Sequence, residues 1–110
     1  MPSYYLSEDL ARFGNISEAD PKGWDAYSKF YATALGEGEL DAKTKKVIAL
    51  AVAYATAEPY CIDAYTSACL DAGYSPEQLA EAVQVVSAMV AGGVLAHWAQ
   101  SCNTITRNEK

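Results

Sequence analysis

Cys61 is the residue of this chain whose type and position best suit nucleophilic or redox chemistry. The sequence Glu58-Pro59-Tyr60-Cys61 predicts a turn that enters a helix, because proline is favoured at the first helical position. Cys61 would then be the third helical residue, where the positive end of the helix dipole favours a thiolate and lowers the thiol pKa. The alternative stays open that Cys61 only fills a core, as free cysteines often do.

Two carboxylates close to Cys61 act against its activation. Glu58 and Asp63 lie at the start of the predicted helix, where the attraction of each carboxylate to the positive end of the helix dipole stabilises the helix by about 0.3–1 kcal/mol. Their negative charge also opposes a thiolate on Cys61, so it partly cancels the effect of the dipole on the thiol pKa.

The remaining candidate groups give no complete redox or metal site. Tyr65 and Cys69 follow Cys61 at steps of four and share its helix face. Cys61 and Cys69 would be about 12 Å apart along the helix axis, whereas a disulfide needs Cα atoms within ~7 Å. Cys102 could approach either of them in space. His97 has no second ligand at a metal spacing, so we expect no metal and no cofactor.

Length and composition indicate one globular domain spanning residues 1–110. The hydrophobic fraction of 51% is ample for a core, and the net charge of −6 argues against nucleic-acid binding. We expect no membrane span, because polar residues and a glycine pair interrupt the apolar run from Val83 to Leu95. Three cysteines without an evident secretory signal favour free thiols in the cytoplasm.

The pattern of caps and apolar spacing predicts an all-α, single-domain bundle of about six helices. N-terminal helices occupy 7–36, with Ser7-Glu8-Asp9 as the candidate cap of the first and Asp20-Pro21 opening the second. A central, nearly all-apolar helix follows the cap Asp41, with Lys43, Lys45 and Lys46 expected on its solvated face. A later helix runs from Pro59 to Ala72. The next begins at the capping box Ser75-Pro76-Glu77-Gln78 and breaks or kinks at Gly92-Gly93. The last helix carries Trp98 and Ile105.

Two apolar stripes are expected to pack inside the protein or between subunits. The first stripe recurs at helical spacing, and its members are Trp24, Tyr27, Phe30 or Tyr31, and Ala34. This pattern favours a core or subunit contact over a substrate pocket. A second stripe should form the buried face of the helix after Ser75, and its members are Leu79, Ala82, Val83, Val86 and Val90.

Residues from about 40 to 100 resemble the carboxymuconolactone decarboxylase superfamily, which includes the alkyl hydroperoxidase D-like proteins. The resemblance is carried by the stretches Leu40–Ala55, Pro59–Thr66 and Ala72–Ala82, and by Gly92-Gly93. The stretch Pro59–Thr66, with Tyr4-Tyr5, is most similar to the arsenosugar-biosynthesis-associated, peroxidase-like subgroup. The resemblance implies an alkyl hydroperoxidase D-like bundle that assembles into homo-trimers or homo-hexamers.

The same resemblance implies a degenerate redox site. In peroxidase-type members a Cys-x-x-Cys at this turn cycles between dithiol and disulfide, assisted by a glutamate on the preceding helix and a histidine. Here Cys61 matches the second cysteine, Glu58 replaces the first, and Tyr65 replaces the histidine. Thr44 stands near the position of the glutamate. Without a second thiol three residues away, Cys61 cannot complete a cycle within that site.

Three functions follow as hypotheses. The first is a residual thiol-dependent peroxidase or disulfide reductase, with Cys61, Glu58 and Tyr65 as its catalytic residues. The second is an acid–base enzyme whose groups converge on one cleft, namely Glu58, Tyr54 and Tyr65, with or without His97. The third is a non-catalytic oligomeric helical or ligand-binding protein. The residues considered as further pocket candidates are Tyr54, Tyr60, Cys69 and His97.

Overall fold

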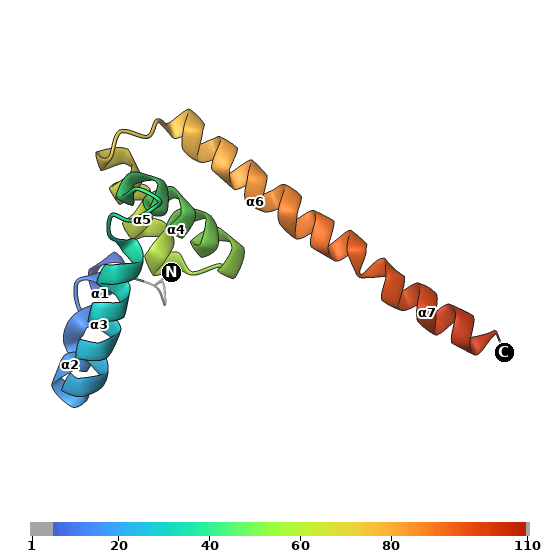
Figure 1. Ribbon diagram of the computed structural model, residues 1–110, viewed down its shortest axis with the longest axis horizontal. Helices are drawn as coiled ribbons and strands as arrows, with labels where there is room; N and C mark the ends of the chain where they lie inside the picture. The colour runs from blue at the N-terminus through green and yellow to red at the C-terminus, as the bar shows by residue number, and fades with distance from the viewer. Residues whose placement is uncertain (1–5, 110) are drawn as a thin grey trace.

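Helices make up nearly the whole of the computed structural model, which describes residues 6–109 apart from the side chains of Ser7 and Leu10 (Figure 1). Three short elements come first: α1 (Ser7–Leu10), the 3-10 helix η1 (Phe13–Asn15) and α2 (Ile16–Ala19). They are followed by α3 (Pro21–Leu35), α4 (Ala42–Thr56), α5 (Pro59–Asp71), α6 (Pro76–Ala96) and α7 (Trp98–Asn108). The all-α fold is confirmed. The described residues form five helices of eleven residues or more, slightly fewer than the expected six.

The helix starts follow the local signals of the sequence. Asp20 and Asp41 accept hydrogen bonds from the backbone N–H groups of Gly23 and Thr44, at 3.0 and 2.7 Å. Ser75 and Gln78 form the complete capping box. The expected cap of the first helix is wrong, because Leu6 occupies that position without a side-chain hydrogen bond. Tyr4 and Tyr5 lie outside the described residues.

The core is small and is centred on α4, as the sequence predicts. Leu50 of α4 is 1% exposed, and it packs with Cys69 of α5 and Leu79 of α6. Val47, Tyr65 and Tyr74 surround this cluster. The fully buried position of Cys69 accounts for its residue type, because free cysteine behaves as a small apolar side chain.

Two of the three lysines near the start of α4 do more than cover a solvated face. Lys45 Nζ donates a hydrogen bond to the carbonyl of Gly36 at 2.7 Å, which ties the end of α3 to α4. Lys43 Nζ lies 4.9 Å from the ring centroid of Tyr74, whose hydroxyl donates to the carbonyl of Lys43. These contacts fix the loops on either side of the core.

Helices α6 and α7 together form a long rod, residues 76–108, which projects from the rest of the chain (Figure 1). The expected break at Gly92-Gly93 is wrong, because α6 continues to Ala96 and only His97 separates it from α7. The rod explains a Cα radius of gyration of 19.0 Å, compared with about 13 Å for a compact domain of this length.

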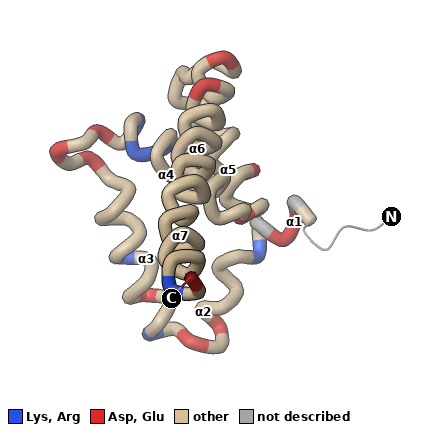
Figure 2. Tube along the Cα trace, turned by 90° about the vertical axis from the view of Figure 1, so that its right-hand side faces the viewer, with Lys and Arg blue, Asp and Glu red and all other residues tan. Residues whose placement is uncertain are grey.

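Most of the apolar surface of the rod is exposed within a single chain. Leu79 is buried, but Val90 is 52% exposed, so the predicted buried stripe holds only near the start of α6. Figure 2 shows few charged positions along the rod, and the sequence from Ala82 to Thr106 contains no Asp, Glu, Lys or Arg.

The segment Pro76–Asn108 is also long and apolar enough, by length and composition alone, to cross a membrane. Its mean hydropathy reaches 1.7 over an 18-residue window, of which 6% is buried. The glycine pair therefore does not interrupt the helix, and that part of the sequence argument against a span is wrong. Core helices of soluble proteins satisfy the same criterion, so the segment does not establish a membrane location.

Candidate functional site

A cavity of about 610 Å³ lies where the N-terminal helices meet the start of α5. One side is aromatic and comes from η1 and α3, with Phe13, Trp24, Tyr27 and Tyr31. The opposite side comes from the turn before α5 and from α5 itself, with Glu58, Tyr60, Cys61, Ala64 and Tyr65. Ser28 completes the lining. We call this cavity the aromatic pocket.

The aromatic side is a row of rings in mutual contact. Phe13 meets the edge of Trp24 at a centroid distance of 5.6 Å and an interplanar angle of 71°. Tyr27 lies 5.8 Å from Trp24 and 5.8 Å from Tyr31. Trp24, Tyr27 and Tyr31 share a face of α3 because they are three and four residues apart. Their spacing favoured a core or subunit contact for this stripe, whereas the structure places three of its members along a pocket. Phe30 is 71% exposed and is not part of the lining.

The turn between α4 and α5 sets the opposite side of the pocket. Ala57 ends α4 in the left-handed conformation, with φ of 54°. The backbone N–H of Glu58 donates to the carbonyl of Ala53 at 2.9 Å. The carboxylate of Glu58 accepts a hydrogen bond from the N–H of Tyr60 at 3.0 Å, so Glu58 is the N-cap and Pro59 the first residue of α5. Cys61 is the third residue of α5, as predicted.

The surroundings of Cys61 do not favour a thiolate. Burial raises the pKa of the Cys61 thiol, and the negative charge of Glu58 raises this pKa further. The hypothesis that the helix start lowers the thiol pKa is therefore wrong, because desolvation and the adjacent acid dominate. Burial also raises the pKa of Tyr65, with a smaller contribution from Tyr27 across the pocket. Both groups are consequently protonated near neutral pH and can act as hydrogen-bond donors.

The raised pKa predicts that Cys61 is a slow nucleophile in the folded protein. We expect iodoacetamide to alkylate Cys61 at pH 7 at least about fivefold more slowly in the native chain than in the urea-unfolded chain, because only the thiolate reacts. The native rate should keep rising above the ordinary thiol pKa of about 8.5, because the pKa of Cys61 is raised. Glu58→Gln should increase the native rate. Peptide mass spectrometry gives these rates, and faster labelling of native Cys61 than of unfolded Cys61 would show an activated thiolate.

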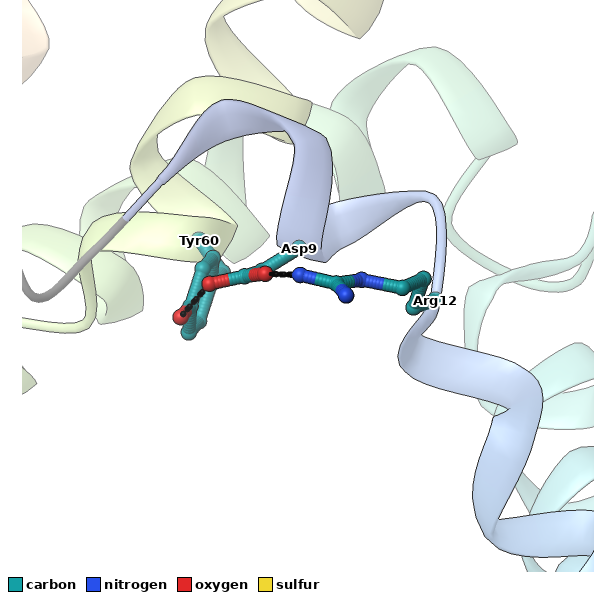
Figure 3. A network of polar contacts seen from close by, with 3 residues as sticks. All are labelled: Asp9, Arg12 and Tyr60. Atoms are coloured by element: carbon teal, nitrogen blue, oxygen red, sulfur yellow. Dashed lines mark hydrogen bonds and ion pairs between the residues drawn. The ribbon is translucent and has the colours of Figure 1, made fainter.

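A polar contact between residues far apart in the sequence joins α1 to the start of α5 (Figure 3). The hydroxyl of Tyr60 donates to the carboxylate of Asp9 at 3.3 Å, and Arg12 pairs with the same carboxylate. Phe13, which follows Arg12 directly, lines the pocket. Residue spacing alone gave no signal for the contact.

The structure brings together some of the residues singled out from the sequence and leaves others apart. Glu58, Tyr60, Cys61 and Tyr65 line the aromatic pocket. The other three candidates are not part of its lining, and they are Tyr54, Cys69 and His97. Tyr54 is 37% exposed on α4, Cys69 is in the core, and His97 lies in the rod.

This placement bears on two kinds of chemistry. The acid–base enzyme needs Tyr54 and His97 to converge on Glu58, and the single chain does not bring them into the pocket. Within residues 6–109, no group of three or more His, Cys, Asp or Glu side chains could hold a metal ion. Cys61, Cys69 and Cys102 are free thiols, and Figure 1 shows α7, which carries Cys102, well away from α5.

Comparison with known proteins gives one family. The sequence model of the carboxymuconolactone decarboxylase family matches residues 21–100, which begins earlier than the expected start near residue 40. An uncharacterized protein of the cox locus of Paracoccus denitrificans is 36% identical over 97 residues, covering 88% of this chain and 87% of that protein. The crystal structure of the apo form of a carboxymuconolactone decarboxylase family protein from Legionella pneumophila superposes with a TM-score of 0.69. It is 26% identical, and the match covers 76% of this chain and 75% of that one.

Proposed function

Since the chain belongs to the carboxymuconolactone decarboxylase family, we propose that it is an oligomeric helical protein that binds a small organic molecule in the aromatic pocket. On this proposal the protein has lost the dithiol chemistry of the peroxidase-type relatives. The observation that carries it is the position of Glu58. This carboxylate lines the same pocket as Cys61, at the place where the resemblance expects a second thiol.

The distribution of the sulfur atoms supports the loss of that chemistry. A dithiol that reduces a peroxide gives up two electrons and forms an S–S bond, so it needs a second thiol within reach. Cys69 is 0% exposed in the core, two turns along α5 from Cys61. Cys102 is on the distant α7. Neither can serve Cys61 within one chain without a rearrangement of the helices.

A one-cysteine peroxidase is the second candidate, and the presence of Cys61 at the pocket favours it. In that reaction the thiolate of Cys61 attacks a peroxide oxygen, the O–O bond breaks, and the products are a cysteine sulfenic acid and water or an alcohol. A first external thiol then condenses with the sulfenic acid to a mixed disulfide and releases water, and a second thiol attacks the mixed disulfide, which frees the Cys61 thiol and forms the external disulfide. The raised pKa of Cys61 opposes the first step, because it lowers the thiolate fraction.

A peroxide turnover assay with a dithiol donor separates the two candidates. We expect the wild type and Cys61→Ser to consume hydrogen peroxide at the same background rate. Glu58→Cys restores the Cys-x-x-Cys spacing and should raise the rate only slightly, because a tyrosine, Tyr65, still occupies the histidine position of the relay. Wild-type turnover that is lost in Cys61→Ser would contradict the proposal and establish the one-cysteine peroxidase.

We also propose that a second copy of the chain covers the rod. The exposed apolar side chains of the rod run along most of its length, and they are Val85, Met89, Val90, Val94, Leu95, Trp98 and Ile105. A β-carbon added to Gly92 or Gly93 would meet no described atom within 4 Å, so another helix could approach their backbone closely. A continuous apolar surface of this kind is typical of a subunit interface. The proposal agrees with the trimers or hexamers that the resemblance implies, and the cytoplasmic location stays a prediction.

A further inference from the structure

The aromatic pocket has the size and walls of a site for a flat organic molecule. Its volume of about 610 Å³ falls within the range of about 300–1,000 Å³ that is usual for small-molecule sites. Rings from η1 and α3 form one wall, and the first turns of α5 form the other. A planar aromatic ligand would bury its two faces between these walls.

The negative charge of Glu58 inside the pocket favours cationic ligands over anionic ones. Glu58 carries a carboxylate, and none of the described lining residues is Lys, Arg or His. Arg12, a cation adjacent in sequence to Phe13, is paired with Asp9 and is not part of the lining. An anionic ligand would therefore meet an unfavourable potential, and a cationic one a favourable potential.

The aromatic wall, like the carboxylate of Glu58, attracts cations. The faces of tryptophan and tyrosine rings are negative, and they attract cations within about 6 Å of the ring centroid. Trp24, Tyr27 and Tyr31 are three such rings in succession. One oxygen of Glu58 accepts the N–H of Tyr60, which orients the carboxylate, and a carboxylate can accept several further hydrogen bonds.

From this geometry we infer that the ligand is an aromatic organic cation that lies between the two walls, with its ammonium-type group between Glu58 and the ring faces of Trp24 and Tyr27. The inference rests on the proposed function, since it names the class of molecule that the pocket binds. It assigns Glu58 a role in recognition in addition to its role as the N-cap of α5.

A shape-matched series of three compounds tests the charge preference. 1-Naphthylmethylamine is a cation at neutral pH, 1-naphthalenemethanol is neutral, and 1-naphthoate is an anion. By isothermal titration calorimetry with the full chain, we expect the amine to bind about tenfold more tightly than the alcohol, and the naphthoate to bind more weakly than both.

Two matched variants show whether Glu58 causes the preference. Glu58→Gln removes the charge but keeps an acceptor for the N–H of Tyr60, and it should reduce the preference for the amine over the alcohol to about threefold or less. Glu77→Gln makes the same change in the first turn of α6, outside the pocket lining, and should leave the preference unchanged. Trp24→Leu should weaken the binding of the amine more than that of the alcohol, which gives a second test if Glu58→Gln does not fold.

The outcomes distinguish this inference from the proposed function. Tightest binding of the alcohol or of the naphthoate would overturn the cation preference while leaving ligand binding in the pocket intact. An equal loss of preference in Glu58→Gln and Glu77→Gln would show that only the overall negative charge of the protein attracts the amine, and it would overturn the role of Glu58. Binding of none of the three compounds would contradict both the inference and the proposed ligand-binding function.

Discussion

Leu95→Glu is expected to break the proposed assembly into single chains. Leu95 is 75% exposed in one chain and lies within the charge-free stretch of the rod, so a second copy that covers the rod would bury it. A buried, unpaired carboxylate costs several kcal/mol. A cost of about 4 kcal/mol weakens association about 10³-fold. The helix itself should persist, because glutamate is a good helix former.

Light scattering coupled to size-exclusion chromatography measures this effect directly. The wild type should have a mass that is a multiple of the 11.8 kDa chain, and Leu95→Glu should approach 11.8 kDa with a lower melting temperature. Gln84→Glu is the matched control, because it adds the same charge to the same helix at a position that is already polar and exposed. A wild-type mass of 11.8 kDa, or equal masses for Leu95→Glu and Gln84→Glu, would contradict the proposal.

Leu50→Ala is expected to have the largest effect on the stability of the individual subunit. Leu50 is 1% exposed and contacts the small cluster that joins α4, α5 and α6. Removal of a buried leucine side chain lowers the free energy of unfolding by about 2–5 kcal/mol, through lost apolar burial and the cavity that remains. Whole domains are stable by only about 5–15 kcal/mol, so this loss is large for a chain with so small a core.

Urea denaturation followed by circular dichroism tests the role of Leu50. Leu70→Ala is the matched control, since it removes the same atoms from a side chain that is 44% exposed, and it should cost about 1 kcal/mol or less. Leu50→Met keeps most of the volume and should cost less than about 1.5 kcal/mol. Equal losses in Leu50→Ala and Leu70→Ala would show that the cluster around Leu50 does not hold the helices together.

The starts of α3, α4, α5 and α6 could be predicted from the sequence because their signals are local. Asp20, Asp41 and Ser75 each act on a backbone N–H three residues away, and Pro59 fits the first position of α5. Physical causes of this kind are contained in a few adjacent residues. They locate Cys61 in the first turn of α5 without knowledge of the rest of the fold.

The continuity of the rod was mispredicted because two local effects compete there. Each glycine in a helix interior costs about 1 kcal/mol relative to alanine, which suggested a break at Gly92-Gly93. The flanking residues are alanines, valines, leucine and methionine, and the helix they form continues through the pair. A weak local penalty therefore did not decide the outcome. Exposure of the rod could not be read from its pattern, because an apolar stripe looks the same whether its own chain or another copy covers it.

The pocket could be predicted only in part, because it depends on contacts between distant segments. Helical spacing placed Trp24, Tyr27 and Tyr31 on one face, but it did not show what that face meets. The hydrogen bond between Tyr60 and Asp9 joins residues 51 positions apart. The balance of burial and charge that raises the pKa of Cys61 likewise arises only in the folded chain.

The left-handed conformation of Ala57, which ends α4, affects how far the pocket is preorganised. Ala57 is the one residue other than glycine with positive φ in the described part of the chain, and this conformation costs an alanine about 1–2 kcal/mol. A glycine would adopt it without strain but would also adopt many other shapes. Alanine has fewer alternative conformations than glycine at the corner between α4 and α5, which favours a single orientation of Glu58 and Cys61 at the pocket. On the proposed function, a ligand would then bind with little rearrangement of this side of the pocket.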